Sequence, residues 1–240
     1  MLVPKAAGGP LLSSPKGTSD MGKSLQVVIE HKTDPDSALG SGARASDRPR
    51  KGFQPQDIAL IAVFAAMIAA LAAVPPIFMV GGVPFALQML VVILIPLVLG
   101  SVRGGAACGL YVLVGLLGVP VFGGQQGGPG ALLGASGWYF IGFILSGFIA
   151  GALATMVLRR RPRRPVMAAS LYGVALDSVA LVYVGGVTGQ MVNASLSLHA
   201  AIVLNLPLLA LDLVKAAVAV MFAIGVFTAF PKLLPVRNRG

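Results

Sequence analysis

The residues best suited to chemistry in this chain are an acid and a base three positions apart, Asp212 and Lys215, inside the otherwise apolar run Pro207–Phe230. Residues at i and i+3 lie on one face of a helix, so both side chains are expected to point the same way. Placing such a charge in hydrocarbon costs at least about 2.5 to 3.5 kcal/mol, and charged residues in membrane spans usually face protein or water. The pair is therefore a site for a polar ligand or a neutralised contact between helices. We favour the ligand site, because small and neutral polar residues can join helices at lower cost.

The composition is typical of a polytopic membrane protein and not of a soluble domain. Of the 240 residues, 56% are hydrophobic and 11% are charged, and the mean hydropathy is +0.88. The net charge of +10 could indicate nucleic-acid binding, but no basic stretch is interleaved with aromatic residues, so we exclude that class. The two histidines are far apart in sequence, and we predict no metal and no catalytic cofactor.

Six apolar segments predict an all-α integral membrane domain over residues 57–231. Helices are expected because backbone polar groups in lipid must be satisfied within the segment. A disordered tail, residues 1–56, precedes the domain, and a short basic tail, residues 232–240, follows it. The predicted spans are Asp57–Val74, Pro84–Gly100, Gly104–Val119, Gly137–Leu158, Val166–Val187 and Pro207–Phe230.

The distribution of basic residues predicts that both termini are cytoplasmic, in a plasma (inner) membrane. With six spans, every Lys and Arg except Lys215 lies on one side, and the opposite connections, near residues 75–83, 120–136 and 188–206, contain none. Basic residues favour the cytoplasmic side. The arginine cluster at 159–164 is expected to fix this topology, with a contact to anionic lipid or a partner as the alternative.

This orientation places the charged pair near the outside. A proline fits the first turn of a helix, so Pro207 would begin the last span, and Asp212 would lie about 8 Å below it at 1.5 Å per residue. Upstream, Ser195 and Ser197 precede an apolar run to Leu204, which predicts a separate short helix with a serine cap. That helix would be either a lid over the site or a plain connection.

A glycine-rich segment, Gly115–Phe143, connects the third and fourth spans on the outer side. It lacks the Lys-Ser or Lys-Thr of a phosphate-binding loop, and we expect a flexible loop with interfacial anchors. Gln125 and Gln126 add hydrogen-bonding groups, while Trp138 and Tyr139 add aromatic surface.

The first span contains two stripes of alanines at a spacing of four residues. Small residues at this spacing let another helix approach closely. The residues alone do not distinguish packing inside the bundle from a surface for a partner. The two stripes are Ala62, Ala66 and Ala70, and Ala65, Ala69 and Ala73.

Together with the Asp-x-x-Lys spacing, these segments resemble the BioY family, the biotin-binding S components of energy-coupling factor (ECF) vitamin transporters. The resemblance extends over residues 57–230. It rests on the alanine-rich first span ending in VPP, GGVPFALQ (81–88), the glycine-rich segment (118–143) and LDLVKAA (211–217). The chain departs from the family where it has ASGWY at 135–139 in place of Pro-Thr-Gly-Gly-Tyr, and Leu211 in place of a glycine before Asp212.

The resemblance implies a six-helix S-component fold and uptake of biotin from outside. The transporter would be energised by a T component with two cytoplasmic ATPases or would act alone. The resemblance also assigns the alanine stripe of the first span to docking on the T component.

Biotin has a carboxylate at one end and a cyclic urea at the other. We expect Lys215 to bind the carboxylate, and Asp212 to accept from the urea N–H groups or to hold Lys215, with exchanged roles as the alternative. The other candidates are Gln88, Gln125, Gln126 and Asn205 for the urea carbonyl, and Tyr139 or Trp138 for packing on the fused rings.

Two other function classes fit the residues. Asp177, within the fifth span, could form an ion or proton relay with Asp212 and Lys215 in a secondary transporter of another small carboxylate. Asp177 could face the site or reach a polar group on a neighbouring helix. The second class is a membrane scaffold without a ligand. We predict no enzymatic activity, because the membrane domain has no nucleophile beside a base and no nucleotide-binding loop.

Overall fold

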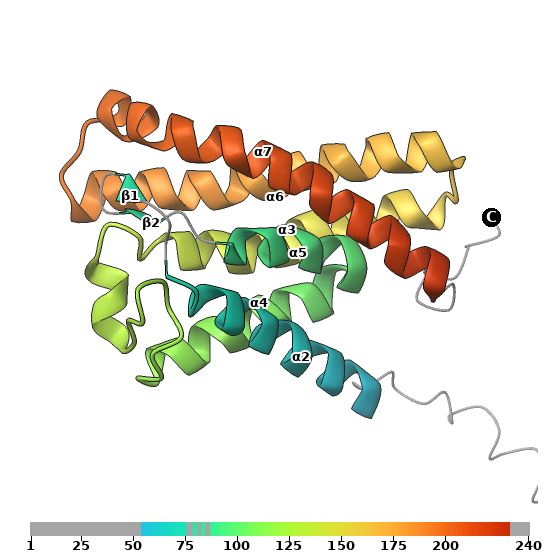
Figure 1. Cartoon of the computed structure of the whole chain (residues 1–240), viewed down its shortest axis with the longest axis horizontal. Coiled ribbons are helices and arrows are strands. Elements are labelled where there is room, and N and C mark those ends of the chain that lie inside the picture. Colours follow the sequence, from blue (N-terminus) through green and yellow to red (C-terminus); the bar gives the residue numbers. More distant parts are fainter. Residues whose placement is uncertain (1–53, 76–78, 81–82, 85–86, 231–240) are drawn as a thin grey trace, which may run out of the picture. The chain divides into compact units, whose positions relative to one another are not determined.

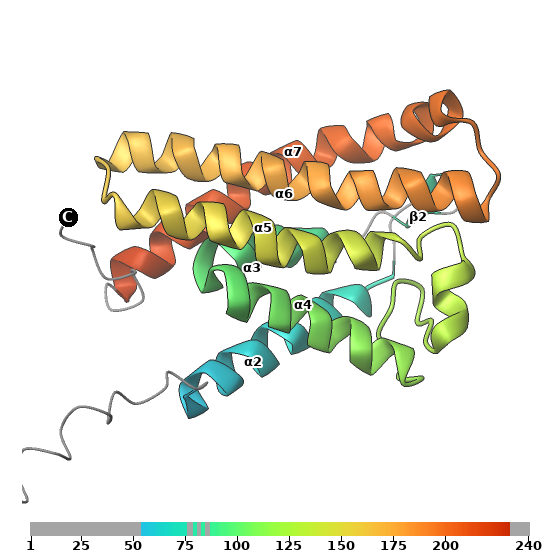
Figure 2. The ribbon, with the colours of Figure 1, turned by 180° about the vertical axis from the view of Figure 1, so that it is seen from behind.

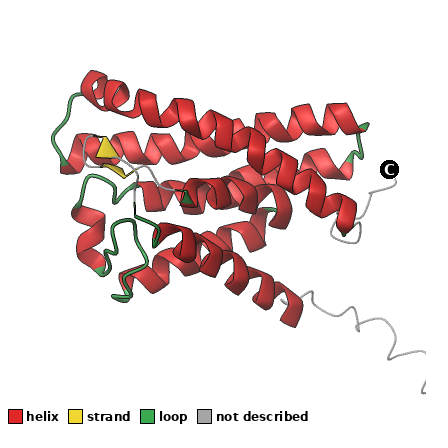
Figure 3. Ribbon diagram, viewed as in Figure 1, coloured by secondary structure: helices red, strands yellow, loops and turns green. Residues whose placement is uncertain are grey.

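The computed structural model of the chain describes residues 54–75, 79–80, 83–84 and 87–230 (Figure 1). The two predicted tails lie outside this part, apart from residues 54–56 at the end of the first. The helices are α2 (Pro55–Ala72), α3 (Gln88–Leu99), α4 (Ser101–Leu116), the short 3-10 helix η1 (Pro129–Leu133), α5 (Tyr139–Arg159), α6 (Arg164–Asn193) and α7 (Leu198–Ala229). Two short strands, β1 (Met79–Val80) and β2 (Val83–Pro84), pair antiparallel, with Met79 opposite Pro84 (Figure 3).

The prediction of an all-helical membrane domain is confirmed for the described residues. Four helices, α2, α5, α6 and α7, are long and apolar enough to cross a membrane. The second and third predicted spans correspond to the shorter apolar helices α3 and α4, of 12 and 16 residues. The fifth predicted span ends too early, because α6 continues from Val187 to Asn193.

The start of the last helix differs from the prediction. Ser197 does cap a helix, its side chain accepting from the backbone N–H of Ala200 at 3.2 Å, but this helix runs without a break to Ala229. A separate outer helix and a last span that begins at Pro207 are therefore both wrong. Pro207 lies inside α7, where it removes one backbone donor, a defect that membrane helices tolerate. Asp212 consequently lies about 21 Å along α7 from Leu198.

Helix α3 lies at the centre of the bundle. It touches every other long helix, and nine of its residues are buried, among them Gln88, Ile93 and Pro96. A helix that is apolar on all sides is expected to be enclosed by others. Because protein surrounds α3 on most sides, it can be only 12 residues long.

The connections gather at two ends of this helical unit (Figures 1 and 2). The start of α2, the α5–α6 connection and the end of α7 lie toward one end, and the glycine-rich segment and the α6–α7 connection lie at the other. At the first end, Arg103 pairs with Asp57 of α2 at 2.7 Å. Arg103 lies between the second and third predicted spans, but it belongs to the first turn of α4, because a single glycine, Gly100, separates α3 from α4.

That turn depends on close contact between backbones. Gly100 has φ +74°, a conformation that suits glycine, and it ends α3 and begins α4. A Cβ on Gly151 of α5 would lie 2.5 Å from the carbonyl carbon and oxygen of Gly100. Helix α5 can therefore approach the α3–α4 turn only because residue 151 has no side chain.

We expect Gly151→Ala to reduce the free energy of unfolding by roughly 1–3 kcal/mol, because the atoms that the methyl group would meet are backbone atoms that cannot rotate away. Thermal unfolding in detergent measures the change. Gly109→Ala on α4 is the matched control, since nothing lies within 4 Å of its Cβ position. Equal midpoints for the two variants would contradict the close packing.

Candidate functional site

Asp212 and Lys215 form an ion pair inside the helical unit. The Lys215 Nζ lies 2.8 Å from Asp212 Oδ1, and the exposed fractions of the two side chains are 12% and 9%. The hydroxyl of Tyr183, on α6, donates to the other carboxylate oxygen, Oδ2, at 2.8 Å. Both oxygens of Asp212 are thus hydrogen-bonded, and the acid is held between α6 and α7.

Buried amides continue this polar region toward the start of α7. The hydroxyl of Tyr139 donates to Asn205 Oδ1. Asn205 Nδ2 donates to Gln190 Oε1 at 2.6 Å and to the carbonyl of Ala201 at 2.8 Å. The rings of Tyr139 and Tyr183 pack edge to face with their centroids 6.1 Å apart, which joins the amides to the charged pair. Residues from α5, α6 and α7 therefore build one cluster.

The aromatic residues Trp138 and Tyr139 pack against glycines of α6. A Cβ on Gly186 would lie 2.0 Å from the Tyr139 ring, and one on Gly189 would lie 2.4 Å from Trp138 Cβ. Trp138 is half-buried at the start of α5 and packs beside Tyr139 on this surface. The glycines thus fix where both predicted aromatic residues lie.

The glycine-rich segment is held in place, in contrast to the flexible loop that the sequence predicts. Phe122 is 1% exposed and stacks on Phe140 of α5 with ring centroids 4.0 Å apart. The backbone N–H of Gly128 donates to the carbonyl of Gly115 at 2.7 Å. Asn193, at the end of α6, donates to the carbonyl of Leu132 at 2.7 Å. A buried aromatic ring and backbone hydrogen bonds therefore order the segment.

The predicted glutamines do not join the cluster around Asp212. Gln88 is buried, and its Oε1 lies 3.2 Å from the hydroxyl of Tyr111, whose single proton it shares with the carbonyl of Val121 at 3.1 Å. Gln125 and Gln126 are exposed in the turn that brings the carbonyl of Gln126 to the N–H of Phe122. Of the four candidates for the urea carbonyl, the structure places Asn205 beside the aromatic and charged residues.

Asp177 stays separate from the charged pair. Its Oδ2 is buried and has no hydrogen-bond partner among the described residues. Among the described residues, this oxygen therefore contacts neither Asp212 nor a polar group of a neighbouring helix. A relay through all three charged residues has no support in the described contacts.

The two alanine stripes of α2 face different surroundings. In one stripe all three residues are exposed, and in the other two residues pack toward the interior while Ala73, just after the helix, is exposed. The interior members contribute to contacts of α2 with α3 and α4. The exposed stripe is Ala62, Ala66 and Ala70, and the interior residues are Ala65 and Ala69.

Sequence reasoning missed Tyr183, Gln190 and Tyr111. A partial signal for the first two exists: residues seven apart lie on one face of a helix, so Tyr183 and Gln190 form a polar stripe on α6. Nothing local shows that this stripe meets Asn205 and Asp212, which are also seven apart on α7. The assembled face has a charged end and a neutral amide end, separated by about 10 Å along α7. It is suited to a molecule that is acidic at one end and neutral but polar at the other.

Comparison with known proteins finds relatives of this chain. A biotin transporter BioY from Rhodobacter capsulatus is 34% identical over 177 residues, covering 70% of this chain and 91% of that protein. One from Rhizobium etli is 30% identical over 184 residues, covering 76% and 98%. The crystal structure of the S-component for biotin from an ECF-type ABC transporter has the same fold, with a TM-score of 0.68 at 22% identity, over 77% of this chain and all of that one.

A family model gives the assignment directly. The model of the BioY family matches residues 45–232, which contain every helix described above. The match confirms the family resemblance predicted from the sequence, and with the apolar helices it makes the chain a multi-pass membrane protein. The chain belongs to the BioY family.

Proposed function

We propose that this chain binds biotin on the outer side of a plasma membrane and carries it inward. The relatives from Rhodobacter capsulatus and Rhizobium etli, both named biotin transporters, support biotin as the ligand. The observation that carries the proposal is the two-ended polar face on α6 and α7. It has the ion pair of Asp212 and Lys215 at one end and the amides of Asn205 and Gln190 at the other.

The chemistry of biotin fits this face. Lys215 binds the carboxylate, since an ammonium group is a compact cation with hydrogen-bond donors. Asp212 holds Lys215 in position, because its two oxygens already accept from Lys215 and Tyr183. At the amide end, Gln190 Nε2 is buried without a hydrogen-bond partner among the described residues, and the urea carbonyl would accept from it. Tyr139 and Trp138 pack on the fused rings.

We propose that the substrate enters from the side of the glycine-rich segment and that six helices cross the membrane, with both termini cytoplasmic. Apart from Lys215, the described basic residues lie at the end away from the glycine-rich segment. They are Arg103 and the five arginines at 159–164, around the α5–α6 connection. Basic residues are retained on the cytoplasmic side. The buried α3 and the short α4 would span the membrane within the bundle, framed by the longer helices.

For energy, we propose assembly with a T component and cytoplasmic ATPases. The exposed stripe Ala62, Ala66 and Ala70 is the surface offered to the T component, because small residues allow close helix approach. Ala65 and Ala69 are already used inside the unit, which narrows the predicted partner surface to one stripe and Ala73.

Calorimetric titration of the detergent-solubilised protein tests the ligand. Biotin should bind, whereas thiamine and riboflavin, which lack the carboxylate opposite a cyclic urea, should not. Tight biotin binding by the isolated chain is incompatible with a pure scaffold. Absence of biotin binding by folded protein would refute the proposal.

Tyr183→Phe should weaken biotin binding about tenfold, because it removes the hydroxyl that orients Asp212, and hydrogen bonds to charged groups contribute about 1.5–3 kcal/mol. Tyr172→Phe is the matched control on the same helix. Its hydroxyl is 3.5 Å from the carbonyl of Leu213 and is exposed, so its loss should leave the affinity unchanged. The same titration measures both variants, and equal affinities would show that Tyr183 does not position the acid.

A further inference from the structure

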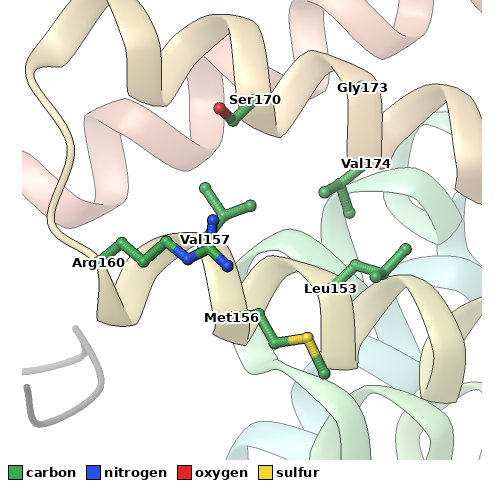
Figure 4. Close-up of a pocket in the computed structure, with 7 residues that line it drawn as sticks. All are labelled: Leu153, Met156, Val157, Arg160, Ser170, Gly173 and Val174. Atoms are coloured by element: carbon green, nitrogen blue, oxygen red, sulfur yellow. The ribbon is translucent and has the colours of Figure 1, made fainter. Parts of the chain in front are cut away.

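A groove of about 300 Å³ lies between α5 and α6, away from the cluster around Asp212. Its walls are mainly apolar: Leu153, Met156 and Val157 from α5, and Gly173 and Val174 from α6 (Figure 4). Leu153 and Met156 are 37% and 59% exposed, so the groove opens on the outside of the helical unit, where hydrocarbon would surround a membrane protein.

One end of the groove is polar. Arg160, the residue that follows α5, reaches back over the groove, and the hydroxyl of Ser170 lies on the α6 side of the same gap (Figure 4). Arg160 is exposed, and its guanidinium carries five N–H donors in a planar fork that matches a phosphate group. An apolar trough with a cation and a hydroxyl at its end is the shape of a site for an amphiphile with an anionic head.

The charge around this end favours an anion strongly. Five arginines occur in the six residues 159–164, and residues 155–176 contain no acid. Among the described residues, the ion pairs are those of Arg103 and Lys215, and none of these five arginines takes part in one. Asp177, the next acid along α6, lies about 10 Å beyond Ser170 toward the middle of the helix, level with the chain of a lipid and not with its head group.

We propose that this groove binds one anionic phospholipid of the leaflet on the arginine side. Its acyl chain lies between α5 and α6, and its phosphate contacts Arg160 and Ser170. A lipid is favoured over a free phosphate because the walls are apolar and open to the hydrocarbon region. Basic pockets between membrane helices select anionic head groups.

Native mass spectrometry of the full-length protein in detergent, with phosphatidylglycerol or phosphatidylcholine of the same acyl chains added, tests the site. The protein should retain phosphatidylglycerol at least about fivefold better, the effect of one arginine near a head group. Arg160→Ala should remove most of this preference. Arg159→Ala is the matched control, because it removes the same charge from the neighbouring residue, the last of α5, which does not line the groove.

A second pair of variants tests the groove itself. Nothing lies within 4 Å of the Cβ position of Gly173, so Gly173→Phe can place its ring in the trough, and it should reduce phosphatidylglycerol adducts at least fivefold. Gly225→Phe on α7, at an exposed and equally open position, should leave them unchanged. Biotin titration of each variant shows that it is folded. If Gly173→Phe does not fold, the comparison of Arg160→Ala with Arg159→Ala decides.

Three results would overturn the proposal. The first is equal retention of the two lipids by the unmodified protein. The second is an equal loss in Arg160→Ala and Arg159→Ala, which would show a general effect of charge. The third is a dimer that Gly173→Phe dissociates, which would assign the groove to a second copy of the chain.

Discussion

Lys215→Ala is expected to weaken biotin binding by between about 30-fold and several thousandfold, while the protein stays folded and inserted. The substitution removes the cation for the biotin carboxylate and leaves Asp212 as an unpaired buried charge. Loss of one partner of a buried, hydrogen-bonded charge pair costs about 2–5 kcal/mol or more. Isothermal titration of purified protein measures the affinity, and size-exclusion chromatography and thermal unfolding confirm the fold.

The other described ion pair supplies the control for this variant. Arg103→Ala breaks the pair with Asp57 at the opposite end of the unit, where the Arg103 side chain is 43% exposed, and it should not change the affinity. The double variant Asp212→Asn, Lys215→Met removes both charges and with them the unpaired acid. It should still bind biotin far more weakly than the unmodified protein, because the cation for the carboxylate is gone. Affinity like that of the unmodified protein, in either Lys215 variant, would make the pair a structural contact only.

Gly186→Ala is expected to lower the affinity for biotin tenfold or more and the free energy of unfolding by roughly 1–3 kcal/mol. The added methyl group would lie 2.0 Å from the Tyr139 ring, so the ring must move. That movement breaks the hydrogen bond of Tyr139 to Asn205 and the edge-to-face contact with Tyr183. Titration and thermal unfolding of the same preparation measure the two effects.

Gly173→Ala is the matched control, since it lies on the same helix with open space at its Cβ position. Alanine is a better helix former than glycine, so this variant should be as stable as the unmodified protein or slightly more stable. Biotin binding by Gly186→Ala at the unmodified level would show that the position of Tyr139 does not matter for the ligand.

The fold could be predicted from the sequence to the extent that single helices determine it. Hydropathy located the long apolar helices, four of them long enough to cross a membrane, because each must satisfy its own backbone and place apolar side chains in lipid or in the bundle. The helix ends are predicted less accurately than the helices themselves. Proline fits a first turn, so the sequence predicts a start at Pro207, but α7 packs against α3 and α6 and continues through the proline, and Ser197 provides the cap.

The site was predictable where its residues are neighbours in sequence. The i, i+3 spacing placed Asp212 and Lys215 on one face, and the ion pair follows from it. Tyr183 and Gln190 were missed because their role depends on the register between α6 and α7, which no local pattern encodes. The contact of Gln88 with Tyr111 likewise joins two helices, α3 and α4, and no local pattern encodes it.

The proline inside α7 has a mechanical consequence. Without an N–H at residue 207, the carbonyl of Val203 lacks its helical donor, so α7 is expected to bend most easily at this point. Asn205 and Asp212, which hold the proposed ligand contacts Gln190 and Lys215, lie on either side of Pro207 within two turns. A small bend of α7 at this proline would change the distance between these two residues and their contacts with Gln190 and Tyr183 of α6.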